Sequence, residues 1–160
     1  MQPVLCFYGV VLTFREITDE NRDAVCDVRV RPGQEKFVDS VEKSLRDAFS
    51  TPEAAPWYRA VYRGDVPVGF VMLSWNVVPR PGILGPYFLW RLLVGEEYQG
   101  RGFGREIVRM VVEMVRADGG RELLTSYQPG VGSPWPFYRG LGFVETGEVE
   151  EGEVVVRLFL

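Results

Sequence analysis

The chain has 160 residues, of which 46% are hydrophobic and 25% are charged, and its net charge at pH 7 is −4. This length and composition suit one folded domain with its own core, without low-complexity segments or internal repeats. The negative net charge excludes binding to nucleic acid or anionic lipid that is driven by overall charge, and it slightly favours a cationic small substrate.

Hydrophobic spacing and turn residues divide the chain into strands and helices. Thr18 or Asp19 is the expected N-cap of the first helix, and Ser133 that of the last, with Pro134 at its first helical position. In chain order, the predicted elements are a strand at 10–17, helices at 18–30 and 34–50, a hairpin with strands at 57–64 and 66–75, a strand at 87–94, a helix at 105–120, a strand at 121–127, a helix at 133–142 and a closing hairpin at 143–160.

This order of elements predicts the fold class. The strand at 87–94 is apolar throughout, which is typical of a central strand covered on both faces. Strands and helices alternate over the rest of the chain. We therefore expect a single α/β (α+β) domain over residues 1–160, with a mixed sheet flanked by helices.

Absent residue types and the N-terminus narrow the function classes further. The chain has no histidine, which excludes Ser-His-Asp and Cys-His nucleophile systems and His-rich metal sites, and no metal site is expected. Cys6 and Cys26 are predicted to be buried free thiols in a reducing compartment. Residues 1–9 are apolar but too short to span a bilayer, so an N-terminal extension, either an extra strand or a loose segment, and a cytoplasmic protein are expected.

The stretch YQGRGFG at residues 98–104 has three glycines between an apolar strand and a long helix. Backbone N–H groups at a helix start lack intrahelical partners, and the helix dipole adds positive potential there. Glycine lets a phosphate approach that backbone closely, so the loop indicates a phosphate or pyrophosphate site. An ordinary turn is the alternative, because the loop lacks the Gly-Lys-Ser/Thr end of a Walker loop and the context of a dinucleotide fingerprint.

A second motif, FYRGLGF at residues 137–143, lies one strand further along the chain. Together with the Gln-x-x-Gly-x-Gly pattern of residues 99–104, it resembles the GCN5-related N-acetyltransferase (GNAT) family, whose order of elements covers essentially the whole chain. The segment VRPGQEKFV at residues 30–38 also resembles diamine or polyamine acetyltransferases, although this resemblance is much weaker.

The family resemblance implies that acetyl-coenzyme A binds where two parallel central strands splay apart. Loop amides would hold the pyrophosphate, and the end of the strand at 87–94 would pair its backbone with the pantetheine arm. Tyr138 would protonate the leaving thiolate, which a phenol can do. A core aromatic is the alternative reading for Tyr138. The expected cofactor-binding residues are Leu92, Leu93, Val94, Gln99, Gly100, Arg101, Gly102, Phe103, Gly104, Arg105 and Ser133.

The chain departs from the family pattern in two places. Many members have an Asn at the start of the Tyr138 helix, and here only Ser133 is available to replace it. Many members also have a Glu on the central strand that faces the amine, and residues 87–94 contain none. The general base is therefore Glu35 or Asp39, Tyr87 acting through water, or no residue at all.

Three functions remain open from the sequence. The first is an N-acetyltransferase for a small primary amine such as a polyamine, with Glu35, Asp39, Tyr87 and Trp90 near the substrate, where aromatic rings can hold an ammonium. The second is an acetyltransferase for proteins or peptides, which needs an open groove. The third is a non-enzymatic acyl-coenzyme A sensor. Exposed edges of the closing hairpin are compatible with a homodimer.

Overall fold

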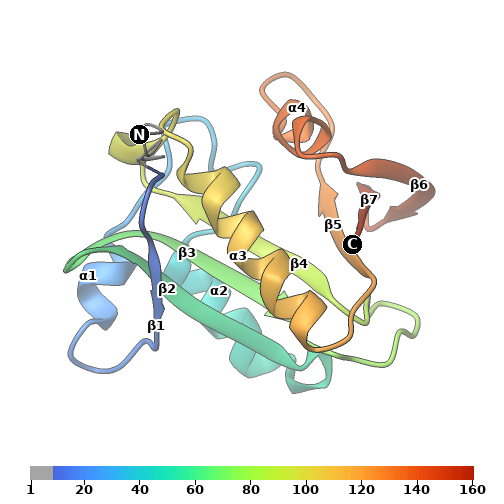
Figure 1. The fold of residues 1–160 in the computed structure, drawn as a ribbon, viewed down its shortest axis with the longest axis horizontal. Helices are drawn as coiled ribbons and strands as arrows, with labels where there is room; N and C mark the ends of the chain where they lie inside the picture. Colours follow the sequence, from blue (N-terminus) through green and yellow to red (C-terminus); the bar gives the residue numbers. More distant parts are fainter. Residues whose placement is uncertain (1–8) are drawn as a thin grey trace, which may run out of the picture.

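A computed structural model describes residues 9–160 and shows a seven-stranded mixed sheet with the order β1-β2-β3-β4-β5-β7-β6 (Figure 1). Every neighbouring pair is antiparallel except β4 and β5, which are parallel. The strands are β1 (Thr13–Arg15), β2 (Pro56–Arg63), β3 (Val66–Ser74), β4 (Phe88–Val94), β5 (Glu122–Tyr127), β6 (Val144–Glu150) and β7 (Glu153–Phe159).

Helices cover both faces of the sheet. The helix α3 (Phe103–Ala117) crosses one face, while α1 (Arg22–Cys26) and α2 (Val41–Ser50) lie behind the sheet in the view of Figure 1. The short helix α4 (Trp135–Gly140) follows β5 and lies beside its end. Two 3-10 turns, Pro52–Ala54 and Glu96–Tyr98, complete the connections.

The sheet separates two hydrophobic cores. Phe70 and Val71 are adjacent in β3 and both fully buried, and their side chains lie in different cores because alternate strand residues point to opposite faces. This double coverage explains why β3 and β4 are almost continuously apolar. The α3 core includes Ile107, Val111, Val115, Leu123 and Val156, and the α2 core includes Val25, Val41, Leu45, Ala60 and Met72.

The predicted first strand and first two helices are too long. The side chain of Asn21 accepts the N–H of Thr18, so residues 18–21 form a turn and neither Thr18 nor Asp19 is an N-cap. The second helix begins only after Ser40, whose side chain accepts the N–H of Lys43 at 3.2 Å. Phe37 therefore lies in a turn and not in a helix. Such local side-chain bonds compete with helix formation, and hydrophobic spacing does not detect them.

Some predictions concern residues near the N-terminus. Cys6 and the first eight residues of the expected extension lie outside the described residues. Cys26 is only half-buried, which partly corrects the prediction of a buried thiol, although burial still raises its pKa. Within residues 9–160, no helix is long and apolar enough to cross a membrane.

The cap at Ser40 gives a stability prediction. Ser40→Ala is expected to lower the free energy of unfolding by about 1 kcal/mol, because the N–H of Lys43 loses its acceptor. Ser50→Ala is the control, since the Ser50 hydroxyl donates to the carbonyl of Arg46 at the opposite end of the same helix. Urea denaturation measures both variants, and an unchanged midpoint for Ser40→Ala would contradict the capping role.

Candidate active site

The sheet opens between β4 and β5. Only two residue pairs join these strands, Phe88 with Leu124 and Leu89 with Thr125. On the other side of β4, Leu89 pairs with Leu73 and Arg91 pairs with Met72, so Trp90 is an extra residue that forms a bulge. Bulges bend a strand and increase its local twist. The remainder of β4 accordingly has no partner in β5, and this gap is the splayed pair of strands that the family resemblance implies.

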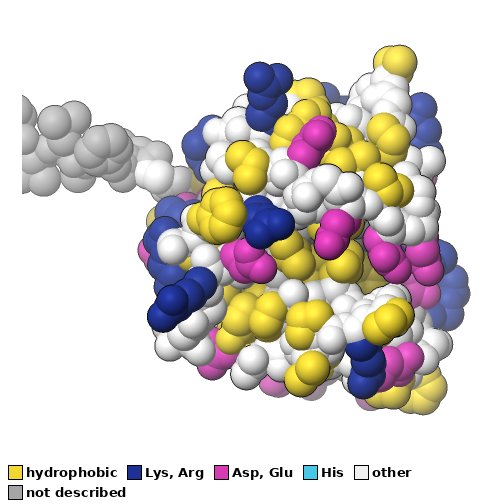
Figure 2. Space-filling view, turned by 90° about the vertical axis from the view of Figure 1, so that its right-hand side faces the viewer, with side chains coloured by type: hydrophobic (Ala, Val, Ile, Leu, Met, Phe, Trp, Pro, Cys, Tyr) yellow, Lys and Arg dark blue, Asp and Glu magenta, His cyan; other side chains and the backbone are white. Residues whose placement is uncertain are grey.

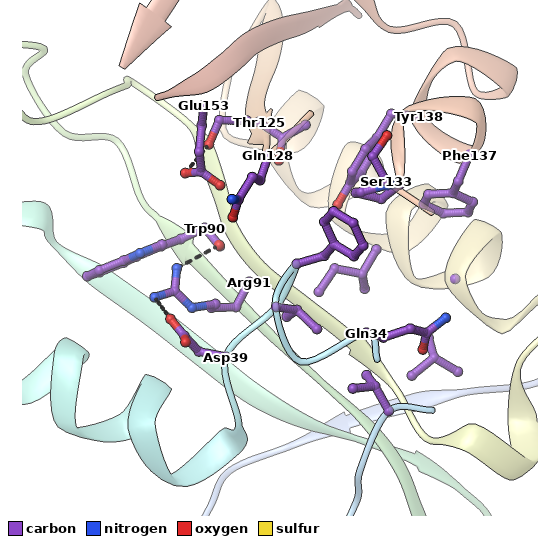
Figure 3. Close-up of a pocket in the computed structure, with 18 of the residues that line it drawn as sticks. Gln34, Asp39, Trp90, Arg91, Thr125, Gln128, Ser133, Phe137, Tyr138 and Glu153 are labelled. Carbon is purple, nitrogen blue, oxygen red and sulfur yellow. Dashed lines mark hydrogen bonds and ion pairs between the residues drawn. The ribbon is translucent and has the colours of Figure 1, made fainter. Parts of the chain in front are cut away.

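A pocket of about 1040 Å³ occupies this gap. Figure 3 shows Tyr138, Phe137 and Ser133 on one side of it and Glu153, Trp90, Arg91 and Asp39 on the other. The pocket thus receives residues from the N-terminal segment, β4, the glycine loop, α4 and the closing hairpin. Most of the predicted site residues meet here: Glu35, Asp39, Trp90, Leu92, Val94, Gln99, Gly100, Gly102, Phe103, Gly104, Arg105, Ser133 and Tyr138 all line it.

Three predicted residues do not line the pocket. Leu93 packs in the α2 core, and Arg101 is exposed beside the glycine loop. Tyr87 is buried in the α3 core, where its hydroxyl donates to Asp118 at 2.5 Å. This hydrogen bond, together with burial, raises the pKa of Tyr87 to about 12. The prediction that Tyr87 contacts the amine is wrong, because its side chain packs in the α3 core against Asp118 and does not line the pocket.

The glycine loop has the geometry that its composition predicts. Gly100 and Gly102 have φ angles of 74° and 83°, a region that favours glycine. Gly102 is the N-cap of α3, a 15-residue helix whose first residues line the pocket. The N–H groups of its first turn therefore lie at the pocket and have no intrahelical partners. The buried ring of Phe103 stacks on Tyr98 with centroids 5.6 Å apart and holds this start of the helix in place.

Gln99 connects the loop to two other parts of the chain. Its side-chain amide donates to the carbonyl of Val94 at 2.9 Å and to the side chain of Gln34 at 2.8 Å. Gln34 in turn accepts the N–H of Arg31 at 3.0 Å. These hydrogen bonds hold the segment at residues 31–34 next to the end of β4, beside the glycine loop.

Tyr138 lies on the first turns of α4, which begins one residue later than predicted. Pro134 occupies the N-cap position, while the hydroxyl of Ser133 accepts the N–H of Trp135 at 3.4 Å. Only 7% of Tyr138 is exposed, and its ring packs edge-on against Phe137 and Phe143. Burial raises the pKa of Tyr138 to about 12, although the neighbouring Thr125 hydroxyl partly offsets this effect.

An ion-pair network lines the pocket on the α2 side. Arg91 donates to Asp39 at 2.8 Å and to Asp47 at 3.0 Å, and the same two carboxylates pair with Lys43. The two acids and two bases neutralise each other. Asp39, predicted as a candidate base, is thus committed to two cations. Glu35, the other candidate, accepts the N–H of Gly33 at 2.7 Å.

Sequence reasoning missed the residues that the closing hairpin contributes. Glu150, Glu151 and Glu153 line the pocket, whereas the sequence predicts only a closing hairpin at 143–160. Glu153 accepts a hydrogen bond from the hydroxyl of Ser126 at 3.2 Å. Figure 2 shows acidic side chains around the hollow on this face of the molecule. Glu153 reaches the pocket because β7 pairs with β5, and local sequence does not indicate which strands are neighbours in a sheet.

Comparisons with known proteins agree with this architecture. The acetyltransferase (GNAT) family model matches residues 14–143. A spermine/spermidine N(1)-acetyltransferase of Bacillus subtilis is 29% identical over 106 residues, which are 64% of this chain. The match spans 66% of that relative, slightly under two thirds of the relative's length.

Two solved structures share the fold. An acetyltransferase from Thermus thermophilus has a TM-score of 0.72 at 19% identity, covering 94% of this chain and 99% of that one. The PaiA N-acetyltransferase of Thermoplasma acidophilum, solved in complex with coenzyme A, has a TM-score of 0.67 at 13% identity, with the same coverage.

The sheet, its central opening and the family match together define the class of protein. The chain belongs to the acetyltransferase (GNAT) family. The predicted fold class and the predicted family are confirmed. Family membership also supports acetyl-coenzyme A as the cofactor.

Proposed function

We propose that this protein transfers the acetyl group of acetyl-coenzyme A to a primary amine of a small polycationic molecule such as a polyamine. One observation carries the choice of acceptor. Glu150, Glu151 and Glu153 line the pocket, and among residues 9–160 none of them is paired with a basic side chain. Unpaired carboxylates around a cavity attract ammonium groups. The similarity to a spermine/spermidine acetyltransferase supports the same class.

The glycine loop is proposed to hold the pyrophosphate. The first-turn N–H groups of α3 and the positive end of its dipole suit an anion, and Gly100, Gly102 and Gly104 leave the approach to them open. Gly95 donates its N–H to Val68 on the β3 side, so the polar groups of Val94 point into the gap. The carbonyl of Val94 is already occupied by Gln99, which leaves the Val94 N–H for the pantetheine arm.

Tyr138 is proposed to donate the proton that the leaving group needs. Acetyl-coenzyme A supplies a thioester, whose thiolate leaves after the amine has attacked the carbonyl carbon. A phenol with a pKa of about 12 stays protonated at neutral pH and is available to donate. Since this pKa is raised, loss of the acidic proton would reduce turnover only as the pH rises toward 12. The alternative reading as a plain core aromatic predicts no role for the hydroxyl.

The first prediction tests the choice of acceptor. Thiol release from acetyl-coenzyme A is expected to be fastest with spermidine or spermine, and slower with an aminoglycoside or with a lysine-containing peptide. High salt should raise KM for the polyamine, because exposed charge–charge attraction is screened. Preference for the peptide would favour a protein acetyltransferase, whereas coenzyme A binding without turnover on any amine would favour a sensor.

A second prediction tests the glycine loop. A Cβ at Gly104 would lie 3.1 Å from the ring of Phe137, in the space between α3 and α4. Gly104→Val is expected to weaken acetyl-coenzyme A binding by more than about tenfold, or about 1.4 kcal/mol, in titration calorimetry. Gly140→Ala is the matched control, because a Cβ there meets nothing within 4 Å. Normal affinity in Gly104→Val would mean that the loop is only structural.

A third prediction concerns the hydroxyl of Tyr138. Tyr138→Phe keeps the ring and its packing, and it is expected to lower kcat by about a hundredfold with little change in acetyl-coenzyme A affinity. The loss should shrink with an acyl donor whose thiol is a better leaving group, since less protonation is then required. Full turnover by Tyr138→Phe on the same amine would show that the proton comes from another group.

A further inference from the structure

Two consecutive residues of β5, Thr125 and Ser126, each contact a titratable side chain at the point where the sheet opens. Thr125, in the last residue pair between β4 and β5, lies beside the phenol of Tyr138. The next residue, Ser126, donates its hydroxyl to Glu153 at 3.2 Å. Consecutive Cα atoms are only about 3.8 Å apart, so the phenol of Tyr138 and the carboxylate of Glu153 contact neighbouring residues of β5 at the edge of the gap.

These two side chains approach the gap from opposite faces of the sheet. Tyr138 belongs to the core under α3. In β7, Val154 and Val156 face that same core, so alternation places Glu153 on the other face, which is also the face of Ser126. The α2 face carries Trp90 and the Arg91 ion pairs as well. A group lying in the gap therefore meets the phenol from one face and the carboxylate from the other.

Glu153 is also the pocket carboxylate best placed to accept a proton at the gap. Asp39 and Asp47 are each held by Arg91 and Lys43. Glu35 is engaged with the backbone N–H of Gly33. The remaining two, Glu150 and Glu151, lie in or beside the turn between β6 and β7, whereas Glu153 is half-buried and hydrogen-bonded to β5.

We propose that Glu153 is the general base that deprotonates the attacking amine, a role that rests on the proposed acetyl transfer. The acceptor enters on the α2 face as an ammonium ion, and Glu153 takes one proton from its nitrogen and passes it to solvent. The nitrogen then bonds to the thioester carbon, the carbon–sulfur bond breaks, and the sulfur takes a proton from Tyr138. The second nitrogen proton returns to the Tyr138 oxygen through water, so one proton is released for each amide formed.

The test compares Glu153→Gln with the native protein. Glutamine keeps the acceptor for Ser126, so the melting temperature and acetyl-coenzyme A affinity should stay unchanged while kcat falls by about a hundredfold at neutral pH. The loss should shrink as pH rises, because more of the amine is then neutral in solution. It should also shrink with an acceptor amine that is already neutral at the assay pH, a rescue that a purely structural role would not produce.

Glu148→Gln is the matched control, since it removes the same charge from an exposed position of the same hairpin, outside the pocket. Its kcat should equal that of the native protein. Native turnover in Glu153→Gln would overturn the role of Glu153 and leave the proposed function intact. A loss that is equal at every pH and with every amine would also overturn it. Absence of turnover in the native protein itself, on every amine tested, would instead overturn the proposed function.

Discussion

The site depends on one irregularity, the extra residue in β4. Up to Leu89, β4 can be paired on both edges, but the bulge at Trp90 turns the strand away from β5. A parallel pair that continued to the ends of both strands would close the sheet with backbone hydrogen bonds and leave no place for a ligand. The bulge also places Trp90 and Arg91 toward the α2 face, while Leu89 lies in the α3 core. One inserted residue thus creates the gap and decides which side chains line it.

Charge is divided unevenly within the pocket. Arg91 has only 16% of its side chain exposed, and its ion pairs with Asp39 and Asp47 follow the rule that buried charges need partners of opposite charge. Because this network is neutral, it contributes little net attraction for an ammonium group. The glutamates of the closing hairpin provide that attraction instead. The network has a structural consequence as well, since it links α2 to the central strand beside the acceptor side of the gap.

Long, strongly patterned segments were predicted well from the sequence. The apolar strand predicted at 87–94 is β4, and the amphipathic helix predicted at 105–120 is α3, which begins two residues and ends three residues earlier, because each follows from the periodicity of its own side chains. Short segments governed by single hydrogen bonds were predicted poorly. Asn21 and Ser40 are the N-cap residues of α1 and α2, and the turns before them have the hydrophobic spacing of a helix. Both N-terminal helices are therefore shorter than expected.

By itself, the sequence determined the family, the position of the glycine loop and the presence of Tyr138 at the start of a helix, because each depends on residues close together in the chain. The tertiary structure alone decided which carboxylate lies at the gap and which aromatic ring does not. Glu153 reaches the pocket through the pairing of β7 with β5, and Tyr87 turns away from it to meet Asp118. Contacts between distant segments depend on how strands order themselves in a sheet, and local spacing contains no information about that order.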